Sequence, residues 1–289
     1  MIPVIDLQAQ DAVKHIEEAY TRVGFAVFKN ALPKEEQALL NKWFEDMKAF
    51  FELSLETKQQ YPYEGDTNLG YSIMGAENVD PTAPKDIKES FNYNNLRMPE
   101  HLWPKELETF KQSALTSIRI ADDLTLSILN IFDFILDTDG LLSKAHEEPF
   151  NTTRVIHYPA YDGPVEDKQM RIGEHSDYGT ITLLWQINDV PGLEVQDLEG
   201  DWHPVPYEED SVVVNIGDLL QRWTNDYFVS TKHRVVNSHI HQERFSMPHF
   251  VDPTPGTIID PAQVRKNENP KYAPIESKEY LMWRLSQSY

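Results

Sequence analysis

The half of the chain after Phe150 is built from short runs rich in β-branched and aromatic residues, most of them separated by glycine or proline turn signals. These runs cover residues 153–158, 180–185, 193–196, 212–216, 231–237 and 245–251. Several short strands at such spacing are typical of a β-sandwich or a β-barrel. We therefore predict a layered or closed β structure here, with a closing helix at about residues 280–285.

The first half of the chain has a different pattern. A strand is predicted at residues 24–27, and Pro33 then opens a helical pattern with Glu35 and Glu36 in its first turn, where acids suit the helix dipole. A second long helical pattern covers about residues 105–134. The stretch between them, residues 61–96, is predicted to be a loop-rich wall. We accordingly expect residues 1–150 to form a helical and strand region that packs on a core of residues 151–289, the two making one catalytic unit.

Charge and composition exclude several classes of function. The 26 basic and 47 acidic side chains give a net charge of −21, which repels phosphate backbones and anionic membrane surfaces. The chain has no cysteine, so disulfides, thiolate metal sites and thiol nucleophiles are excluded. We expect neither a nucleic-acid nor a membrane partner.

The N-terminal residues also bear on location. They read MIPVIDLQAQDAVKHIEEAY, in which two acids, Asp6 and Asp11, come before the first basic residue, Lys14, a pattern unlike a secretory signal. No segment has the roughly 18 consecutive apolar residues that span a bilayer. A cytoplasmic protein is the expectation.

The segment GEHSDYGTITLLWQ carries the first chemical signal. His175 and Asp177 are two positions apart, so their side chains share one face of an extended backbone, and His233 follows in the predicted strand TKHRVVN. Two imidazoles and one carboxylate are the facial triad of non-haem iron(II) oxygenases, which leaves the opposite side of the ion open for a co-substrate and dioxygen. An isolated His-x-Asp is more often a surface or turn feature, so the pair alone decides little.

Further polar residues strengthen this interpretation. Arg244 and Ser246 are same-face neighbours on the next predicted strand, and Tyr158 lies upstream in RVIHYP. Arginine offers a planar pair of donors to a carboxylate, and the two hydroxyls could add hydrogen bonds. Singly, Arg244 could be a surface ion pair, Ser246 incidental and Tyr158 a core residue; their conjunction with the triad in this order favours a carboxylate site.

Longer blocks of sequence resemble a known family. The sequence is similar to the isopenicillin N synthase-like branch of the iron(II)/2-oxoglutarate dioxygenases over nearly its whole length. The matching blocks are IPVIDL, GFAVFKNALP, YPYEGDTNLGYSIMGAE, KESFNYN, HSDYGTITLLWQ, VVVNIGDLLQRWTNDYFVSTKHRVVN and ERFSMPHFVDP. Many members have asparagine two residues before the tyrosine, where this chain has Ile156.

The resemblance implies a fold and an activity. The fold would be α+β, a double-stranded β-helix (jelly-roll) core with the N-terminal helices packed against it. The metal ligands would be His175, Asp177 and His233, and the distal carboxylate of 2-oxoglutarate would be held by Arg244 and Ser246, with Tyr158 assisting. The enzyme would be an iron(II)- and 2-oxoglutarate-dependent dioxygenase that uses dioxygen to oxidise, and in most such cases hydroxylate, a small molecule, with release of succinate and CO2.

Three alternatives remain open from the sequence. An oxidase of the same fold shares the Arg-x-Ser pair, needs no 2-oxoglutarate and would bind its own substrate's carboxylate at Arg244. A jelly-roll protein could bind a ligand without catalysis. A structural zinc site would need a fourth ligand, which the sequence does not suggest.

The organic substrate is not specified by any motif. Tyr71, Phe91, Tyr93 and Trp185 are candidate wall residues for a substrate with an apolar part, and core packing explains each of them equally well.

Overall fold

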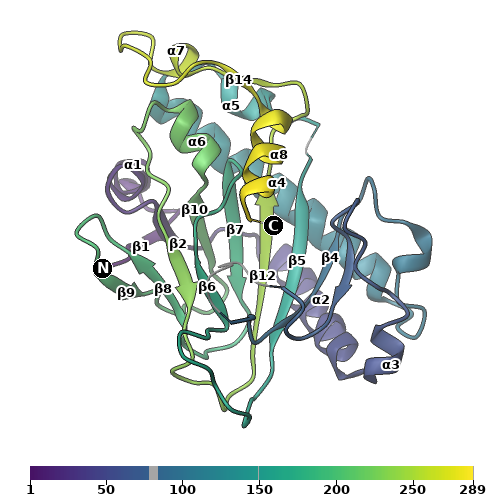
Figure 1. Cartoon of the computed structure of the whole chain (residues 1–289). Coiled ribbons are helices and arrows are strands. Elements are labelled where there is room, and N and C mark those ends of the chain that lie inside the picture. Colours follow the sequence, from purple (N-terminus) through teal and green to yellow (C-terminus); the bar gives the residue numbers. More distant parts are fainter. Residues whose placement is uncertain (78–83, 149, 289) are drawn as a thin grey trace.

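The computed structural model describes residues 1–77, 84–148 and 150–288 of the chain, and two facing β-sheets form its centre (Figure 1). The large sheet has the strand order β1-β2-β10-β7-β12-β5-β4-β3, with β1 and β2 parallel and the other neighbours antiparallel. In chain order its strands are β1 (Val4–Asp6), β2 (Phe25–Lys29), β3 (Gly70–Ser72), β4 (Glu89–Tyr93), β5 (Thr152–Tyr158), β7 (Ile181–Gln186), β10 (Val212–Ile216) and β12 (Arg244–Val251).

The small sheet faces the large one and has the order β6-β11-β8-β9. Its strands are β6 (Ile172–His175), β8 (Leu193–Gln196), β9 (Trp202–Pro204) and β11 (His233–Val235), all paired antiparallel. Apolar residues of both sheets form one buried cluster between them, which includes Phe25 and Ile156 from the large sheet and Ile172 and Val195 from the small one. A further short pair, β13 (Ile258–Ile259) and β14 (Ile275–Glu276), lies outside these layers.

Helices cover the other face of the large sheet (Figure 1). The long helices α2 (Lys34–Glu52) and α4 (Phe110–Leu136) pack against each other and against that face, together with α1 (Ala12–Arg22). Apolar residues at helical spacing in α2, among them Trp43, Met47 and Phe50, are fully buried there. The shorter helices are α3 (Leu55–Lys58), the 3-10 turn η1 (Glu100–Leu102), α5 (Leu141–Lys144), α6 (Asp218–Trp223), α7 (Pro261–Val264) and α8 (Ser277–Ser288).

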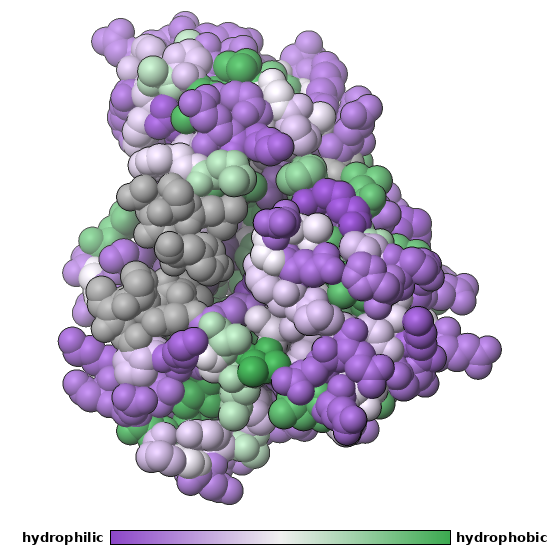
Figure 2. Space-filling model, turned by 45° about the vertical axis from the view of Figure 1, so that its right-hand side comes forward, coloured by the Kyte–Doolittle hydropathy of each residue, from purple (hydrophilic) through white to green (hydrophobic). Residues whose placement is uncertain are grey.

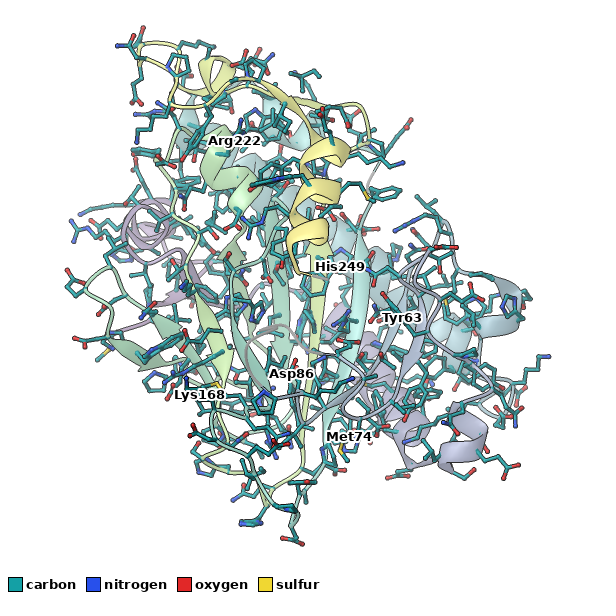
Figure 3. All side chains as sticks on the ribbon, viewed as in Figure 1. Tyr63, Met74, Asp86, Lys168, Arg222 and His249 are labelled. Atoms are coloured by element: carbon teal, nitrogen blue, oxygen red, sulfur yellow. The ribbon has the colours of Figure 1, made fainter. Side chains whose placement is uncertain are left out.

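Side chains alternate across the large sheet, as the period of a β-strand requires. In β12, Phe245 and Met247 belong to the core beneath the helices, whereas Arg244 and Ser246 lie on the inner face, toward the small sheet. His249 of β12, labelled in Figure 3, also lies on the helix side, where its ring nitrogens contact Thr153 of β5 and Asp122 of α4. The inner face of the large sheet is therefore the surface that any site between the sheets can use.

Most predicted elements are present, with shifted ends. The β runs after Phe150 become strands, but the run at 231–237 shortens to β11, and the pairing register with β6 shifts within it, between His233 and Val235. The loop-rich stretch at 61–96 contains β3 and β4, which extend the large sheet. Among the described helices, none is both long and apolar enough to cross a membrane.

Candidate metal centre and co-substrate site

Two histidines and one aspartate converge between the sheets. His175 ends β6, Asp177 lies in the loop that follows, and His233 begins β11 directly opposite His175. Their ligand atoms all lie within 4.8 Å of one another. Nε2 of His175 is 3.9 Å and Nε2 of His233 is 3.7 Å from Oδ1 of Asp177. This is the kind of cluster that could hold one metal ion.

Backbone carbonyls fix the orientation of both imidazoles. Nδ1 of His175 lies 2.9 Å from the carbonyl oxygen of Gly173, and Nδ1 of His233 lies 3.2 Å from that of Thr231. A carbonyl only accepts, so each Nδ1 must carry the proton and donate it. In the neutral tautomer that this hydrogen bond selects, Nε2 is the nitrogen with a free lone pair, which is the form that binds a metal.

Hydrogen bonds also orient the Asp177 carboxylate. Its Oδ2 accepts from the hydroxyl of Thr182 at 2.6 Å and from the side-chain amide of Asn215 at 2.7 Å. Both donors lie on the inner face of the large sheet, in β7 and β10. Because Oδ2 is occupied by these two donors, Oδ1 is the oxygen left to face the histidines.

The electrostatics of the cluster favour the metal-binding protonation states. Burial, followed by the neighbouring His233, lowers the pKa of His175 to about 4, so the ring is neutral near pH 7. Burial alone would raise the pKa of Asp177, but the two imidazoles and the two hydrogen bonds at Oδ2 together lower it below its ordinary value. A neutral ring and an ionised carboxylate are what a divalent cation requires.

The start of α6 holds the loop that carries Asp177. Backbone N–H groups of Gly217, Asp218 and Leu219 donate to carbonyl oxygens of the loop 177–180 over 2.8–3.2 Å. The backbones approach so closely that a Cβ at Gly217 would lie 2.2 Å from the carbonyl oxygen of Gly179. Only glycine leaves room for this contact.

A buried guanidinium without an acceptor lies farther along the inner face. Arg244 is 1% exposed, and none of its three side-chain nitrogens has a hydrogen-bond partner among the described residues. Its guanidinium carbon lies 4.9 Å from the ring centroid of Tyr158, its register partner in β5. The hydroxyl of Tyr158 is 3.4 Å from Oγ of Ser246. Arg244, Ser246 and Tyr158 thus form one donor-rich cluster, which we call the clamp.

The donors present fit iron(II) and a carboxylate-bearing co-substrate. Two neutral imidazoles and one carboxylate are suited to non-haem iron(II) and leave coordination positions open. A buried, unpaired guanidinium is strongly destabilising unless an anion pairs with it. Burial lowers the pKa of Arg244 from its ordinary value, yet an arginine side chain stays charged near pH 7. An anionic carboxylate is a partner that fits the donors of the clamp.

The four aromatic residues considered for the substrate pocket lie elsewhere. Tyr71, Phe91, Tyr93 and Trp185 are at most 3% exposed and belong to the core beneath the helices. Tyr71 also donates to the buried Glu89 on that side. Strand alternation directs them away from the metal cluster, so the structure does not bring them to it, and core packing accounts for their burial.

The side chains on the other face of β4 and β5 point inward, toward the small sheet. Asn92 of β4 and Arg154 of β5 contact each other there, with Nε of Arg154 donating to Oδ1 of Asn92 at 2.7 Å. Arg154 also pairs with Glu77, which in turn contacts Lys88. Asp86, labelled in Figure 3, accepts from the backbone N–H of Gly173 in β6 at 3.1 Å. A charged and polar wall therefore stands near the metal cluster.

Sequence reasoning missed the residues that support Asp177. Asn215 is the polar residue of an otherwise apolar strand, VVVNI, and a buried amide in such a run requires a partner. That signal could have identified Asn215. Thr182 carries no such signal, because threonine is common in strands.

The ligand set and the fold together define a class. Two imidazole nitrogens and one carboxylate oxygen that face one point between two β-sheets are the arrangement of mononuclear non-haem iron oxygenases. Comparison with known proteins gives the family. The family model described as the 2OG-Fe(II) oxygenase superfamily matches residues 149–253, and that described as non-haem dioxygenase in morphine synthesis N-terminal matches residues 2–110.

Individual relatives agree over nearly the full chain. The proline hydroxylase buaE of Petromyces alliaceus is 32% identical over 96% of this chain and 91% of its own. The validamycin A dioxygenase of Streptomyces hygroscopicus subsp. limoneus is 27% identical over 90% of this chain and 79% of its own. A full-length Neurospora crassa protein, solved in complex with alpha-KG and thymine, is 30% identical, with a TM-score of 0.86 over 100% of this chain and 97% of that one.

The chain belongs to the 2OG-Fe(II) oxygenase superfamily. The jelly-roll fold and the activity predicted from the sequence are thereby confirmed. The protein is an iron(II)- and 2-oxoglutarate-dependent dioxygenase that oxidises a small molecule with dioxygen. The comparisons favour this activity over an oxidase that needs no 2-oxoglutarate, a non-catalytic binding protein and a structural zinc site.

Proposed function

We propose that His175, Asp177 and His233 hold the iron(II) ion and that the clamp holds the distal carboxylate of 2-oxoglutarate. The observation that carries this proposal is the guanidinium of Arg244, which is buried on the inner face of the core without an acceptor among the described residues. A bidentate carboxylate would satisfy its planar donors, and Ser246 and Tyr158 would add one hydrogen bond each.

Each side chain has a separate task in this proposal. Iron(II) and 2-oxoglutarate, when bound, supply the oxidising chemistry, in which dioxygen converts 2-oxoglutarate to succinate and CO2 and oxidises the substrate. The carbonyls of Gly173 and Thr231 hold the imidazole protons on Nδ1, and Thr182 and Asn215 hold the Asp177 carboxylate. The apolar cluster between the sheets keeps water from the clamp.

The substrate is proposed to be a small polar molecule that is hydroxylated. Support comes from the inner wall, where Asn92 and Arg154 take the place of the aromatic residues considered from the sequence. Three relatives agree with such a substrate: a proline hydroxylase, a validamycin A dioxygenase and a protein solved with thymine. The face shown in Figure 2 is mostly hydrophilic and is hollowed near its centre.

Succinate release tests the proposal directly. Iron-loaded protein should release succinate from 2-oxoglutarate under oxygen, and a screen of small polar metabolites should contain some that stimulate the release. His175→Ala should abolish turnover while the fold remains. His241→Ala is a matched control, because His241 is exposed and pairs with Asp162 on the surface. Full iron-dependent activity in His175→Ala would refute the ligand assignment.

We also propose a domain organisation, a set of excluded partners and a cellular location for the protein. We propose one catalytic unit, in which residues 1–150 supply the covering helices and residues 151–289 the oxygenase core; the shared large sheet, with β4 beside β5, supports this. The net charge of −21 supports the absence of nucleic-acid and anionic membrane partners. A cytoplasmic location is also proposed, and cell fractionation tests it.

A further inference from the structure

A second buried guanidinium lies beside the clamp. Arg171 immediately precedes β6 and is 0% exposed. Its Nη2 donates to the carbonyl oxygens of Gln242 at 2.5 Å, Ile240 at 3.2 Å and Pro159 at 3.4 Å. Its Nε and Nη1 have no hydrogen-bond partner within the described part of the chain. One nitrogen of Arg171 is thus used by the fold, and two are not.

Arg171 and Arg244 share one tyrosine. The guanidinium carbon of Arg171 lies 5.7 Å from the ring centroid of Tyr158, and that of Arg244 lies 4.9 Å from the same centroid. No carboxylate of the described residues comes within 4.0 Å of either group, since neither arginine takes part in an ion pair. Burial, followed by the nearby Arg244, lowers the pKa of Arg171. Arg171 and Arg244 therefore place two buried positive charges beside Tyr158, and no acid of the described residues compensates them.

Such an arrangement is unfavourable in the absence of an anion. Like charges repel more strongly in a buried site than in water, and each unpaired N–H loses its hydration. A chain with a net charge of −21 has many carboxylates that could pair with these arginines, yet none of the described ones is placed there. The uncompensated pair indicates a site for an external anion.

We propose that Arg171 is a second arginine of the co-substrate site and donates from Nε and Nη1 to the distal carboxylate of 2-oxoglutarate. This inference rests on the proposed function of the clamp. The carboxylate would then lie between two guanidinium groups, with the hydroxyls of Ser246 and Tyr158 as further donors. The position two residues before Tyr158 cannot contribute, because Ile156 is apolar and buried in the cluster between the sheets.

Arg171 and Arg244 together should distinguish 2-oxoglutarate from 2-oxo acids that lack a distal carboxylate. Two guanidinium groups interact with the distal end of the co-substrate and not with its 2-oxo acid end. Loss of Arg171 should therefore weaken the binding of 2-oxoglutarate and leave unaffected a 2-oxo acid that ends in a methyl group. A purely structural arginine, which only tied the segment 240–242 to Pro159, would affect both ligands equally.

The test measures binding and not turnover. Iron(II)-loaded protein is titrated without oxygen, by calorimetry, with 2-oxoglutarate and separately with 2-oxopentanoate, which lacks the distal carboxylate. The variants are Arg171→Gln, Arg171→Lys and Arg244→Ala. Arg119→Gln is the matched control, because Arg119 lies exposed on α4 and pairs with Glu36 and Asp123 at the surface. Thermal unfolding of every variant is recorded alongside.

Arg171→Gln should weaken 2-oxoglutarate binding by about tenfold or more, the loss expected for one charge-assisted hydrogen bond. Its affinity for 2-oxopentanoate should stay within about twofold of wild type, which is below the loss of even one neutral hydrogen bond. Arg171→Lys should fall between wild type and Arg171→Gln for 2-oxoglutarate, since it keeps the charge and loses the planar fork.

Three results would overturn the inference. If Arg171→Gln weakens both ligands equally and lowers the unfolding temperature, Arg171 has a structural role only. If Arg171→Gln binds 2-oxoglutarate like wild type while Arg244→Ala does not, the clamp stands and Arg171 is not part of it. If Arg244→Ala also binds 2-oxoglutarate like wild type, the proposed clamp itself fails, and this inference fails with it.

Discussion

The side-chain amide of Asn215 donates a 2.7 Å hydrogen bond to Oδ2 of Asp177, from a strand of the large sheet to the loop that follows β6. Together with Thr182 it fixes which carboxylate oxygen faces the two imidazoles. The large sheet therefore supports the cluster of His175, Asp177 and His233 although none of these three residues lies in it. In the proposed metal site, β10 and β7 would therefore help to set the metal affinity.

Asn215→Ala should lower iron(II) affinity by about 10- to 100-fold, the usual effect of removing a residue that orients a metal ligand. Thr182→Val should act in the same direction, because it removes the other donor to Oδ2. Competition with a metal chelator gives the affinities. Asn41→Ala serves as control, since Asn41 is exposed on α2. An unchanged iron affinity in both Asn215→Ala and Thr182→Val would show that the carboxylate needs no support.

Substitutions in the clamp should change the 2-oxoglutarate requirement and not the iron requirement. Each charge-assisted hydrogen bond from Arg244 contributes about 1.5–3 kcal/mol, so Arg244→Ala should raise the 2-oxoglutarate concentration at half-maximal rate by about tenfold or more. Arg244→Lys should be intermediate and Ser246→Ala milder. Succinate release during a co-substrate titration gives these values. A titration curve for Arg244→Ala that overlays wild type would contradict the assignment.

Gly217→Ala should disturb the loop that carries Asp177. The added Cβ would lie 2.2 Å from the carbonyl oxygen of Gly179, so the two backbones must separate. Overpacking of this kind destabilises by about 1–3 kcal/mol, and iron affinity should fall with it. Urea unfolding and chelator competition measure the two effects. Gly65→Ala is the matched control, because no described atom lies within 4 Å of a Cβ there. Equal stability and iron affinity in both variants would argue against the close approach.

The free energy of unfolding should decrease as the pH is lowered, and His146 should contribute to this decrease. This side chain is 1% exposed; its Nδ1 donates to the carbonyl of Leu142, and its Nε2 accepts from the hydroxyl of Thr180. Burial lowers the pKa of His146 from 6.5 to about 4. Between these values the unfolded chain binds a proton that the folded chain excludes, so the free energy of unfolding decreases as pH falls.

The matched measurement compares metal-free wild type with metal-free His146→Gln by urea unfolding at pH 7.5 and pH 5. The stability advantage of wild type should shrink by about 2 kcal/mol between the two pH values, from the proton linkage of one histidine. Other groups titrate in both proteins and cancel in the difference. A difference that is independent of pH would mean that His146 takes up its proton equally in the folded and the unfolded states.

The sequence was sufficient to predict those features that depend on spacing along one strand or one motif. His175 and Asp177 are close in sequence, and alternation alone places Arg244 beside Ser246 on one face of β12. The β runs after Phe150 were visible because glycine and proline separate most of them. In each case the information is local; ligand chemistry joined His233 to the pair, and the resemblance to a family implied the same three residues.

Features that depend on tertiary contacts could not be predicted in this way. The aromatic residues considered for the pocket satisfy a local pattern equally well on either face of a strand, and only the packing of α2 and α4 decides which face is the core. Arg171 precedes β6 in a stretch with no motif of its own. Its position beside Tyr158 arises from the approach of the small sheet to β5, which no spacing in the sequence records.

The alternation along β12 has a consequence for how this enzyme can diverge. Odd-numbered positions from Phe245 to Val251 pack beneath the helices, and Arg244 and Ser246 lie on the inner face, where the clamp is proposed. Replacement of any one of these side chains changes one surface only. A one-residue deletion or insertion inside β12 would exchange the two surfaces at once, with phenylalanine in the clamp and arginine in the core. Across its lineage, β12 should therefore accept new residue types far more readily than a change in length.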